Sequence, residues 1–428
     1  MYQTGDEAIG WIDSRTKHGS RPGLIRVKEL LRLVGNPEDD VKSIHIAGTN
    51  GKGSTVMYLR VLLEQKNLTV GTFTSPYIES FYERIAINGQ PIPEQDFVNL
   101  TNKFAPLVEK MDREDSFSGI TQFEILTAMA FDYFKDRVDI AIIETGIGGL
   151  LDSTNVVKPE LCAITTVGLD HVDILGDTLE KIAEQKAGII KQNIPIVSGN
   201  IPNNAQTVIQ TAAKKVHAPS FVWKTDYKTE YLGFKDQFEM FNFQNQYIKL
   251  QNLKTPLTGH QQVENAAVAL ELFYLYCQSH KYSFDESQIQ QGLSKVFWPA
   301  RMEVVSQNPL IIMDGAHNPH AIKRLKDNIL TEYQDKRIHI LFSAITTKNI
   351  DSMLKDLLTI PQLDFTLTTF DYPNALTLTD YQNFDGITID SNWQQVLEDK
   401  QDQMGEADVL FVTGSLYFVS QVRDFIKD

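Results

Sequence analysis

The sequence predicts an α/β protein with two domains, each built on a mainly parallel β-sheet. Short apolar runs of strand length alternate with amphipathic segments, beginning with the run at 44–47 and the helical segment from Ser54 to about Lys66. The alternation starts again near Phe297, after a β-rich stretch at 221–250 and a long helical segment. We therefore expect a larger domain over residues 1–297 and a smaller, doubly wound domain over residues 298–428.

Composition places the chain among globular proteins and argues against several classes of partner. The chain has 428 residues, of which 42% are hydrophobic, and its formal net charge of -15 argues against nucleic-acid binding. The N-terminus lacks the basic and apolar regions of a signal peptide, and no apolar run approaches the length of a membrane span. The two cysteines, Cys162 and Cys277, lie far apart in apolar contexts and suggest no disulfide or thiolate site. We expect a monomeric cytoplasmic protein without a membrane partner.

The first predicted strand ends in a turn that is typical of phosphate binding, Gly48-Thr49-Asn50-Gly51-Lys52-Gly53-Ser54. Glycines let backbone N–H groups approach phosphate oxygens, the following helix N-terminus adds a positive field, and Lys52 adds a charge. The turn departs from G-x-x-x-x-G-K-[ST], because Gly48 and Gly51 are closer together and Gly53 stands where a magnesium-binding hydroxyl is expected. The sequence therefore predicts a P-loop ATPase-type domain whose hydroxyl ligand comes from elsewhere.

Three further strands bring polar side chains to the same predicted sheet edge. Ser75 follows the strand that begins near residue 68, Glu144 ends the strand at 138–144, and His171 follows the strand at 161–167. The carboxyl ends of parallel strands share one edge, where ligands bind in α/β sheets. Each residue alone has an ordinary structural explanation. Together, a hydroxyl, a carboxylate and an imidazole beside a triphosphate predict a magnesium site completed by water.

Other residues receive structural explanations from the sequence alone. Thr121 and Glu124 fit the capping box of a helix that runs to Phe134. Lys186, on a predicted helix at 180–188, is by itself typical of a surface charge. An exposed loop face is the expectation for the basic residues Arg15, Lys17, His18 and Arg21, although they could contact phosphate.

The second domain repeats the strand–helix alternation on a smaller scale. A strand at 310–313 ends in Asp314, and His317 follows it closely; further strands are predicted at 338–342, 365–369 and from 409 to 415. This pattern predicts a Rossmann-like α/β domain with Asp314 and His317 at its carboxyl edge.

These motifs resemble the folylpolyglutamate synthases and dihydrofolate synthases within the wider Mur ligase group. The stretches that carry the resemblance run in family order over nearly the whole chain. They are Gly48–Ser54, Thr74-Ser75-Pro76, Glu83-Arg84-Ile85, Thr121-Gln122-Phe123-Glu124, Leu151-Asp152-Ser153-Thr154-Asn155, Gly168-Leu169-Asp170-His171, Glu184–Lys191, Trp298-Pro299-Ala300-Arg301, Asp314–Pro319 and Thr413-Gly414-Ser415-Leu416-Tyr417.

The resemblance implies an ATP-dependent ligase that joins a folate carboxylate to the amino group of L-glutamate through an acyl phosphate. Magnesium ligands would be Ser75, Glu144 and His171. Nucleotide contacts would be Gly51, Lys52, Gly53, Ser54, Asn265, Arg301 and Asp314. Folate contacts would be Thr121, Phe123, Leu151 and Asp152. Catalytic residues would be Lys52, which neutralises charge on the transferred phosphoryl group, Lys186, which matches a lysine that becomes carbamylated, and His317, which orients glutamate or ATP or else only begins a helix.

One departure from the family concerns the folate pocket. Many members carry arginine where this chain has Leu150, so the preferred pterin state stays open. The motifs do not separate a polyglutamate synthase, which we favour, from a bifunctional enzyme that also makes dihydrofolate from dihydropteroate. A cell-wall Mur ligase is disfavoured because the phosphate-binding turn comes as early as residue 48, which leaves no room for a UDP-binding domain before it. A P-loop switch without ligase activity is a remoter alternative, and the glycine spacing at 146–149 excludes a dinucleotide fingerprint.

Overall fold

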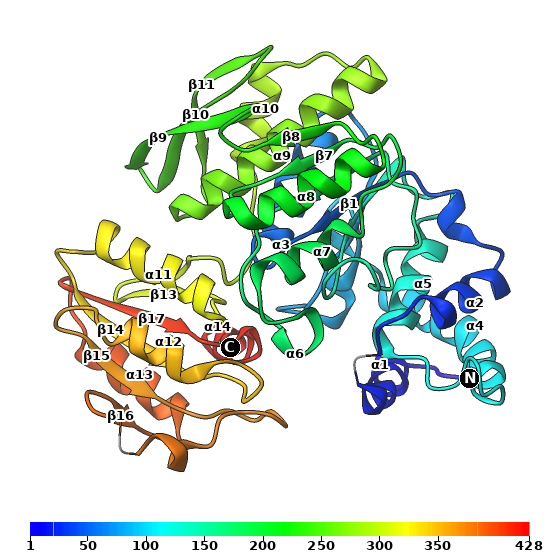
Figure 1. Cartoon of the computed structure of the whole chain (residues 1–428). Coiled ribbons are helices and arrows are strands. Elements are labelled where there is room, and N and C mark those ends of the chain that lie inside the picture. The colour runs from blue at the N-terminus through cyan, green and yellow to red at the C-terminus, as the bar shows by residue number, and fades with distance from the viewer. Residues whose placement is uncertain (20, 383, 428) are drawn as a thin grey trace. The chain divides into compact units, whose positions relative to one another are not determined.

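The structure is a computed structural model that describes residues 1–19, 21–382 and 384–427 (Figure 1). The chain divides into two compact units. The first comprises Met1–Tyr231, Phe241–Lys254 and Val263–Val296, and the second comprises Leu232–Met240, Thr255–Gln262 and Phe297–Asp428. The two short segments of the second unit that precede Phe297 were not predicted, because the sequence analysis placed a single boundary at residue 297.

Regular elements cover most of both units. The helices of the first unit, including most of α9, are α1 (Gly5–Asp13), α2 (Ile25–Leu33), α3 (Lys52–Glu64), α4 (Glu94–Asp112), α5 (Gln122–Phe134), α6 (Val172–Leu175), α7 (Leu179–Ala187), α8 (Asn203–Lys215), α9 (His260–His280) and α10 (Glu286–Leu293). The helices of the second unit are α11 (Pro319–Glu332), α12 (Ile350–Leu357), α13 (Trp393–Gln403) and α14 (Leu416–Lys427). Short 3₁₀ helices are η1 (Ser14–His18), η2 (Pro37–Asp39), η3 (Phe81–Arg84) and η4 (Leu378–Tyr381).

The first unit is built on a large sheet with the strand order β4-β3-β2-β5-β1-β6-β7-β8. Its strands are β1 (Ser43–Ala47), β2 (Val70–Phe73), β3 (Ile85–Ile87), β4 (Gln90–Pro91), β5 (Ile140–Glu144), β6 (Leu161–Ile164), β7 (Ile196–Ser198) and β8 (Ser220–Val222). The six neighbouring strands β2, β5, β1, β6, β7 and β8 are parallel. Strands β3 and β4 extend the sheet beyond β2 with antiparallel pairing. The predicted mainly parallel sheet is therefore confirmed.

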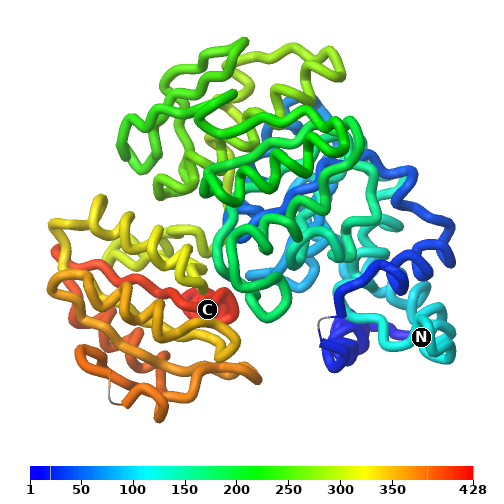
Figure 2. Tube along the Cα trace, in the orientation of Figure 1, coloured from blue at the N-terminus to red at the C-terminus, as the bar shows by residue number. Residues whose placement is uncertain are grey.

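The earliest strand lies in the middle of this sheet. β1 pairs with β5 on one side and β6 on the other, and β2 pairs with the far side of β5. The Cα trace in Figure 2 carries these strands in its blue, cyan and green parts. The carboxyl ends of these four neighbouring strands therefore lead into the glycine-rich turn, Glu144, Ser75 and the segment that contains His171. This is the shared edge that the sequence predicted.

Two hydrophobic clusters cover one face of the sheet. One packs α1, α2, α4 and α5 against Ala141 and Ile143 of β5, and the other packs α7 and α8 against Cys162 and Ile164 of β6. Residues in register on parallel strands point to the same side. His45 is in register with Ile143 and with Cys162, so its side chain lies on this apolar face.

A three-stranded sheet follows, with the order β11-β10-β9, where β9 is Tyr227–Lys235, β10 is Phe238–Asn245 and β11 is Lys249–Thr255. The second unit has a sheet with the order β12-β13-β17-β14-β15-β16. Its strands are β12 (Glu303–Gln307), β13 (Leu310–Met313), β14 (Arg337–Phe342), β15 (Asp364–Leu367), β16 (Thr388–Ile389) and β17 (Asp408–Thr413).

Among the described strands of the second unit, only β12 is antiparallel, so the Rossmann-like α/β prediction is confirmed. The final strand, β17, lies in the interior of the sheet between β13 and β14. Throughout the described ranges of both units, no helix is long and apolar enough to cross a membrane.

Candidate active site

The glycine-rich turn joins β1 to the first residue of α3. Gly51 immediately precedes the helix with a left-handed backbone, φ 83°, and a Cβ at this position would lie 2.3 Å from Oδ1 of Asn265. Only glycine satisfies both constraints, and the near contact places Asn265 against the turn, as the resemblance implied. The first turn of α3 contains no acidic residue and has no side-chain cap. Its N-terminal N–H groups, which lack intrahelical partners, suit an anionic phosphate.

The turn is held from the side by the end of β6. The N–H of Thr49 donates to the carbonyl of Thr166 at 2.9 Å, and the N–H of Asn50 donates to Oγ1 of Thr166 at 2.9 Å. In return, Oγ1 of Thr165 donates to the carbonyl of Asn50 at 2.6 Å. These bonds fix the backbone of the turn before any ligand binds.

Lys52, Glu144 and Ser75 converge beside the turn. Nζ of Lys52 donates to the carbonyl of Gly48 at 3.1 Å and lies 3.8 Å from Oε1 of Glu144. The backbone N–H of Ser75 donates to Oε2 of the same glutamate at 3.4 Å. The carboxylate of Glu144 is nearly fully buried, so its charge acts in a weakly screened environment. The structure therefore brings together two of the three predicted magnesium ligands and the predicted catalytic lysine.

His171 lies at the same edge, after β6, as the residue before α6. Its backbone is left-handed, with φ 49°, its N–H donates to Oδ1 of Asp170 at 2.9 Å, and its ring Nε2 lies 3.9 Å from that oxygen. Among the described residues, no group of three His, Cys, Asp or Glu side chains could hold a metal ion. The predicted set contains only two residues of these types, and the third donor is the hydroxyl of Ser75. The hydroxyl oxygen of Ser75 and the carboxylate oxygens of Glu144 are the kind of ligand that magnesium prefers.

Lys186 is buried on α7 and is not the surface charge that its helix alone suggested; that interpretation is wrong. Burial and the nearby charge of Lys52 lower the pKa of Lys186 to about 7, while Asp170 and Asp152 oppose the shift. The influence of Asp170 on this lysine could not be predicted from local spacing, because the two residues come from different parts of the chain. A lysine in this environment carries a substantial neutral fraction near neutral pH.

The predicted folate residues gather around the loop that follows β5. The ring of Phe123 packs against Gly146, where a Cβ would lie 2.8 Å from Cζ of the ring, and against Phe73, with ring centroids 5.6 Å apart. Oδ2 of Asp152 lies 3.3 Å from the same Cβ position. Burial raises the pKa of Asp152, and hydrogen bonds from Thr154 and from backbone N–H groups oppose the rise.

Leu151 and Thr121 complete this group. The side chain of Leu151 is half-exposed, and its carbonyl accepts a hydrogen bond from Gly23 at 3.3 Å. Thr121 and Glu124 form the predicted capping box, because Oγ1 of Thr121 accepts from the N–H of Glu124 at 3.3 Å and Oε2 of Glu124 accepts from the N–H of Thr121 at 2.8 Å. The capping-box prediction is confirmed.

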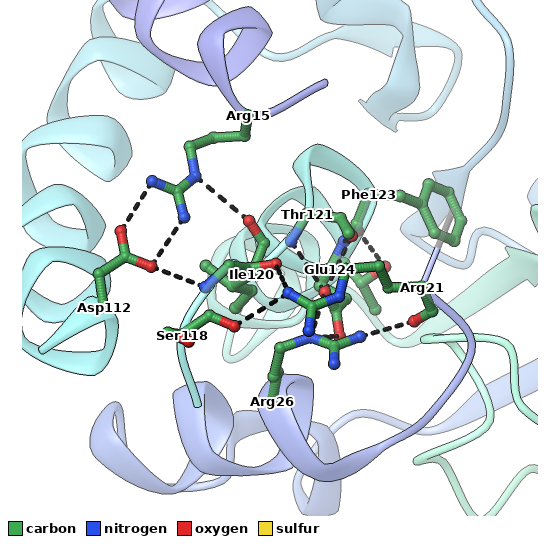
Figure 3. A network of polar contacts seen from close by, with 11 residues as sticks. Arg15, Arg21, Arg26, Asp112, Ser118, Ile120, Thr121, Phe123 and Glu124 are labelled. Atoms are coloured by element: carbon green, nitrogen blue, oxygen red, sulfur yellow. Dashed lines mark hydrogen bonds and ion pairs between the residues drawn. The ribbon is translucent and has the colours of Figure 1, made fainter. Parts of the chain in front are cut away.

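Three arginines from the N-terminal part of the chain support this capping box and the segment that leads into it (Figure 3). Nε of Arg26 lies 3.0 Å from Oε1 of the buried Glu124. Arg15 donates to both oxygens of Asp112, at 2.8 and 3.0 Å, and to the carbonyl of Ile120 at 3.2 Å. Arg21 donates to the carbonyl of Gly119 at 3.0 Å. The expected exposed loop face is therefore wrong for Arg15, which is buried and fixes the segment that leads into Thr121.

The second unit holds its own group of predicted residues at the carboxyl edge of its sheet. Asp314 follows β13 and accepts backbone N–H bonds from Met302 at 3.0 Å and from Ala316 at 2.9 Å. Burial raises the pKa of Asp314, and the charge of Arg301 opposes that rise. Nδ1–H of His317 donates to the carbonyl of Gly315 at 2.8 Å. Helix α11 is capped by Asn318 rather than by His317, so the histidine has no capping role there.

Comparison with known proteins agrees with this arrangement. A family model for the Mur ligase middle domain matches residues 46–273, and one for the Mur ligase glutamate ligase domain matches residues 300–416. The dihydrofolate synthase/folylpolyglutamate synthase of Bacillus subtilis is 39% identical over 438 residues, with 100% of both chains covered. The folylpolyglutamate synthase of Lacticaseibacillus casei is 33% identical, with 97% of each chain covered.

A solved structure supports the same relationship. An FPGS–AMPPCP–folate complex matches with a TM-score of 0.87 at 31% identity, and the match covers 100% of both chains. Fold, motif order and full-length identity therefore agree. The chain belongs to the folylpolyglutamate synthase and dihydrofolate synthase family of Mur ligases.

Proposed function

We propose that the protein is an ATP-dependent ligase that adds L-glutamate to the glutamyl carboxylate of a folate, with release of ADP and phosphate. The observation that carries the proposal is the convergence of the phosphate-binding turn, Lys52 and Glu144 at one sheet edge. The group formed by Phe123, Gly146 and Asp152 lies in the same unit. The folate-ligase relatives, which match over the full length, support the substrate class.

The chemistry follows from the weakness of a carboxylate as an electrophile. A folate carboxylate oxygen attacks the γ-phosphorus of ATP, and the bond from this phosphorus to the β,γ-bridging oxygen breaks. ADP departs, and the folate carboxylate has become an acyl phosphate. Backbone N–H groups at Gly51–Ser54 hold the phosphate oxygens, and Lys52 offsets charge as it develops during transfer. The glutamate amine then attacks the acyl carbon, phosphate leaves, and the amine loses a proton to give the amide.

The remaining predicted residues fit supporting roles. Magnesium, when bound by Ser75, Glu144 and His171, would supply positive charge next to the phosphate oxygens. Asn265, packed against Gly51, and the pair Arg301 and Asp314 of the second unit are proposed nucleotide contacts. His317 is proposed to orient glutamate or ATP. Its Nδ1–H is fixed by the carbonyl of Gly315, which sets the orientation of the ring.

We also propose that Lys186 is carbamylated. The neutral amine would attack carbon dioxide and lose a proton, so that a cation becomes an anion able to help hold magnesium. The support is the burial of Lys186 and its pKa of about 7. With ¹³C-labelled bicarbonate, the wild type is expected to show a carbamate carbon signal that is missing from Lys186→Ala.

Lys186→Ala is also expected to reduce turnover at saturating ATP by about ten- to a hundredfold, as for the loss of a group that supports a metal site. The fold should remain intact by circular dichroism. The matched control is Lys181→Ala on the same helix, whose exposed side chain pairs with Asp177, and it should keep normal turnover. Near-normal turnover of Lys186→Ala would contradict the carbamate proposal.

The test of the function is phosphate release with ATP, magnesium and L-glutamate, together with the mass of each product. The folate acceptors to compare are dihydropteroate, tetrahydrofolate and tetrahydrofolate diglutamate. Addition of glutamate units to the folates alone would establish a polyglutamate synthase. Turnover of dihydropteroate as well would establish the bifunctional enzyme, and phosphate release that does not require glutamate would overturn the ligase proposal.

A further inference from the structure

A buried histidine lies on β1, just before the phosphate-binding turn. His45 is the middle residue of the strand, is fully buried, and shares the apolar sheet face with Ile143 and Cys162. An imidazole in such surroundings costs free energy unless its polar atoms are hydrogen bonded. Its Nε2 lies 2.8 Å from Oγ1 of Thr154, and in the part of the chain that the structure describes its Nδ1 has no hydrogen-bond partner.

The direction of each hydrogen bond follows from Asp152. Its Oδ1 accepts the backbone N–H of Thr154 at 3.0 Å and lies 2.5 Å from Oγ1 of the same residue, while its Oδ2 accepts the N–H of Ile147 at 2.9 Å. Both oxygens of Asp152 act as acceptors of N–H bonds, and Thr154 donates its single hydroxyl proton to Oδ1. Oγ1 of Thr154 must then accept from His45, which carries its proton on Nε2.

The protonation state of the imidazole agrees with this geometry. Burial lowers the pKa of His45 to about 3, so the ring is neutral at neutral pH and carries one proton. In the other tautomer the N–H would be on Nδ1, which has no acceptor among the described residues. Nε2 would then have no hydrogen to donate to Oγ1 of Thr154. The hydrogen bonds therefore run in one direction, from His45 through Thr154 to Asp152.

We infer that His45 and Thr154 are positioning residues that fix the carboxylate of Asp152 beside the folate. The inference rests on the proposed function, because Asp152 lies with Phe123 and Gly146 in the candidate folate group. Donor bonds in series strengthen one another in a water-free interior. Without the donor from His45, the buried hydroxyl of Thr154 loses one partner and holds Asp152 less firmly.

The expected effect is selective for one substrate. The chain of bonds ends at Asp152, whereas the contacts of Lys52 run to Gly48 and Glu144. Removal of the donor should therefore raise the KM for folate and leave the KM for ATP unchanged. A histidine or threonine that only stabilises the core would instead affect both substrates equally or affect neither.

The test compares two pairs of variants in steady-state kinetics and in direct folate binding. Thr154→Val removes the hydroxyl, and Thr154→Ser keeps it. His45→Leu removes the N–H donor, and His45→Gln keeps an N–H donor at this position. The first variant of each pair is expected to raise the folate KM and Kd about tenfold, as for the loss of one buried hydrogen bond, with the ATP KM within about twofold of wild type. The second variant of each pair should restore both values. Thr101→Val is the matched control, because it removes an equally buried hydroxyl from α4.

A separate readout examines the histidine itself. In protein labelled with ¹⁵N-histidine, the His45 signal is expected to show a proton on Nε2 and none on Nδ1, with no change between about pH 5 and pH 8. In Thr154→Val this signal should shift, since the acceptor is gone. A proton on Nδ1 would overturn the inference.

The kinetic outcomes also decide between the proposals. If Thr154→Val and His45→Leu fold and keep the wild-type folate KM and Kd, or if the ATP KM rises as much as the folate KM, the inference is wrong. Selectively weakened folate binding in a wild type that shows no glutamylation would uphold the inference and overturn the proposed function. A wild type that does not bind folate would overturn both.

Discussion

Gly51 is under two constraints at the phosphate-binding turn. Its φ of 83° disfavours any side chain, and a methyl group would lie 2.3 Å from Oδ1 of Asn265. Gly51→Ala is expected to cost about 1–3 kcal/mol in backbone strain and to raise the KM for ATP by about tenfold or more. Steady-state kinetics with varied ATP would measure this change.

The matched control for Gly51→Ala is Gly10→Ala, where the added methyl group meets no atom within 4 Å in a helix interior. It should raise the free energy of unfolding by up to about 1 kcal/mol and leave the KM for ATP unchanged. A wild-type ATP KM in Gly51→Ala would show that the turn relaxes without loss of function.

The buried Lys186 makes stability depend on pH. An unfolded lysine keeps its proton up to a pKa of 10.5, whereas the folded protein releases this proton near pH 7. Above pH 7 the unfolded state therefore binds more protons, and stability rises with pH. Between pH 7 and 9, in buffer freed of carbon dioxide, the free energy of unfolding of the wild type should rise by about 2 kcal/mol more than that of Lys186→Met. Parallel urea-denaturation profiles for the two proteins would contradict the burial of a neutral amine.

At the level of single residues, the sequence predicted which side chains meet at the site better than it predicted the burial of each side chain. Strand ends place Ser75 and Glu144 at one edge because a parallel sheet fixes where its strands finish. The burial of Lys186 and Arg15 could not be read from local spacing. Both depend on partners from other elements, such as Asp152 for the lysine and Asp112, 97 residues away, for the arginine.

Helix α2 carries a matched pair of arginines with different surroundings. Arg26 faces the buried Glu124, and its own side chain is only 13% exposed, whereas Arg32 is 62% exposed and pairs with Glu29 on its own helix. Arg26→Met would leave Glu124 buried without its cation and should lower the free energy of unfolding by about 2–3 kcal/mol. Arg32→Met should cause no measurable change.

Arg26→Met should also raise the KM for folate, because Glu124 holds Thr121 through the capping box. Urea denaturation and folate kinetics of the two variants would provide both comparisons. Equal stability of Arg26→Met and Arg32→Met would show that the capping box does not depend on α2.

At the level of elements, buried strands and amphipathic helices were predictable, and short edge strands were not. β1, β5, β6, β13 and β14 lie inside their sheets and read as continuous apolar runs. β3, β4, β12 and β16 lie at or near sheet edges, where mixed exposure removes the apolar signal. The stretch at 76–91 mixes aromatic and charged residues without clear periodicity, and it contains η3 and the β3–β4 hairpin.

The second unit depends as a whole on its final strand. β17 pairs with β13 on one side and β14 on the other, and Leu410 at its centre is fully buried. Leu410→Asp would bury a charge without a partner and should unfold the second unit, since that cost is comparable to the stability of a small domain. Hydrogen exchange followed by mass spectrometry should show faster exchange in β13 and β14, with β1 and β5 unchanged.

The control for Leu410→Asp is Ile389→Asp on the edge strand β16, where the side chain is only partly buried. It should leave exchange in β13 and β14 close to wild type. If Leu410→Asp had the same mild effect, the sheet would not depend on its middle strand.

The position of β17 also affects how the protein is made in the cell. A ribosome synthesises this strand after β13 and β14, so those two strands emerge without the neighbour that separates them in the finished sheet. Their unpaired edges are templates for pairing with other chains. A transcript with a premature stop before residue 408 would therefore yield a chain that retains the sequence of the first unit. In this chain the edges of β13 and β14 that normally pair with β17 would have unpaired backbone groups. Such chains should be taken up by chaperones and proteases rather than accumulate as partly active enzyme.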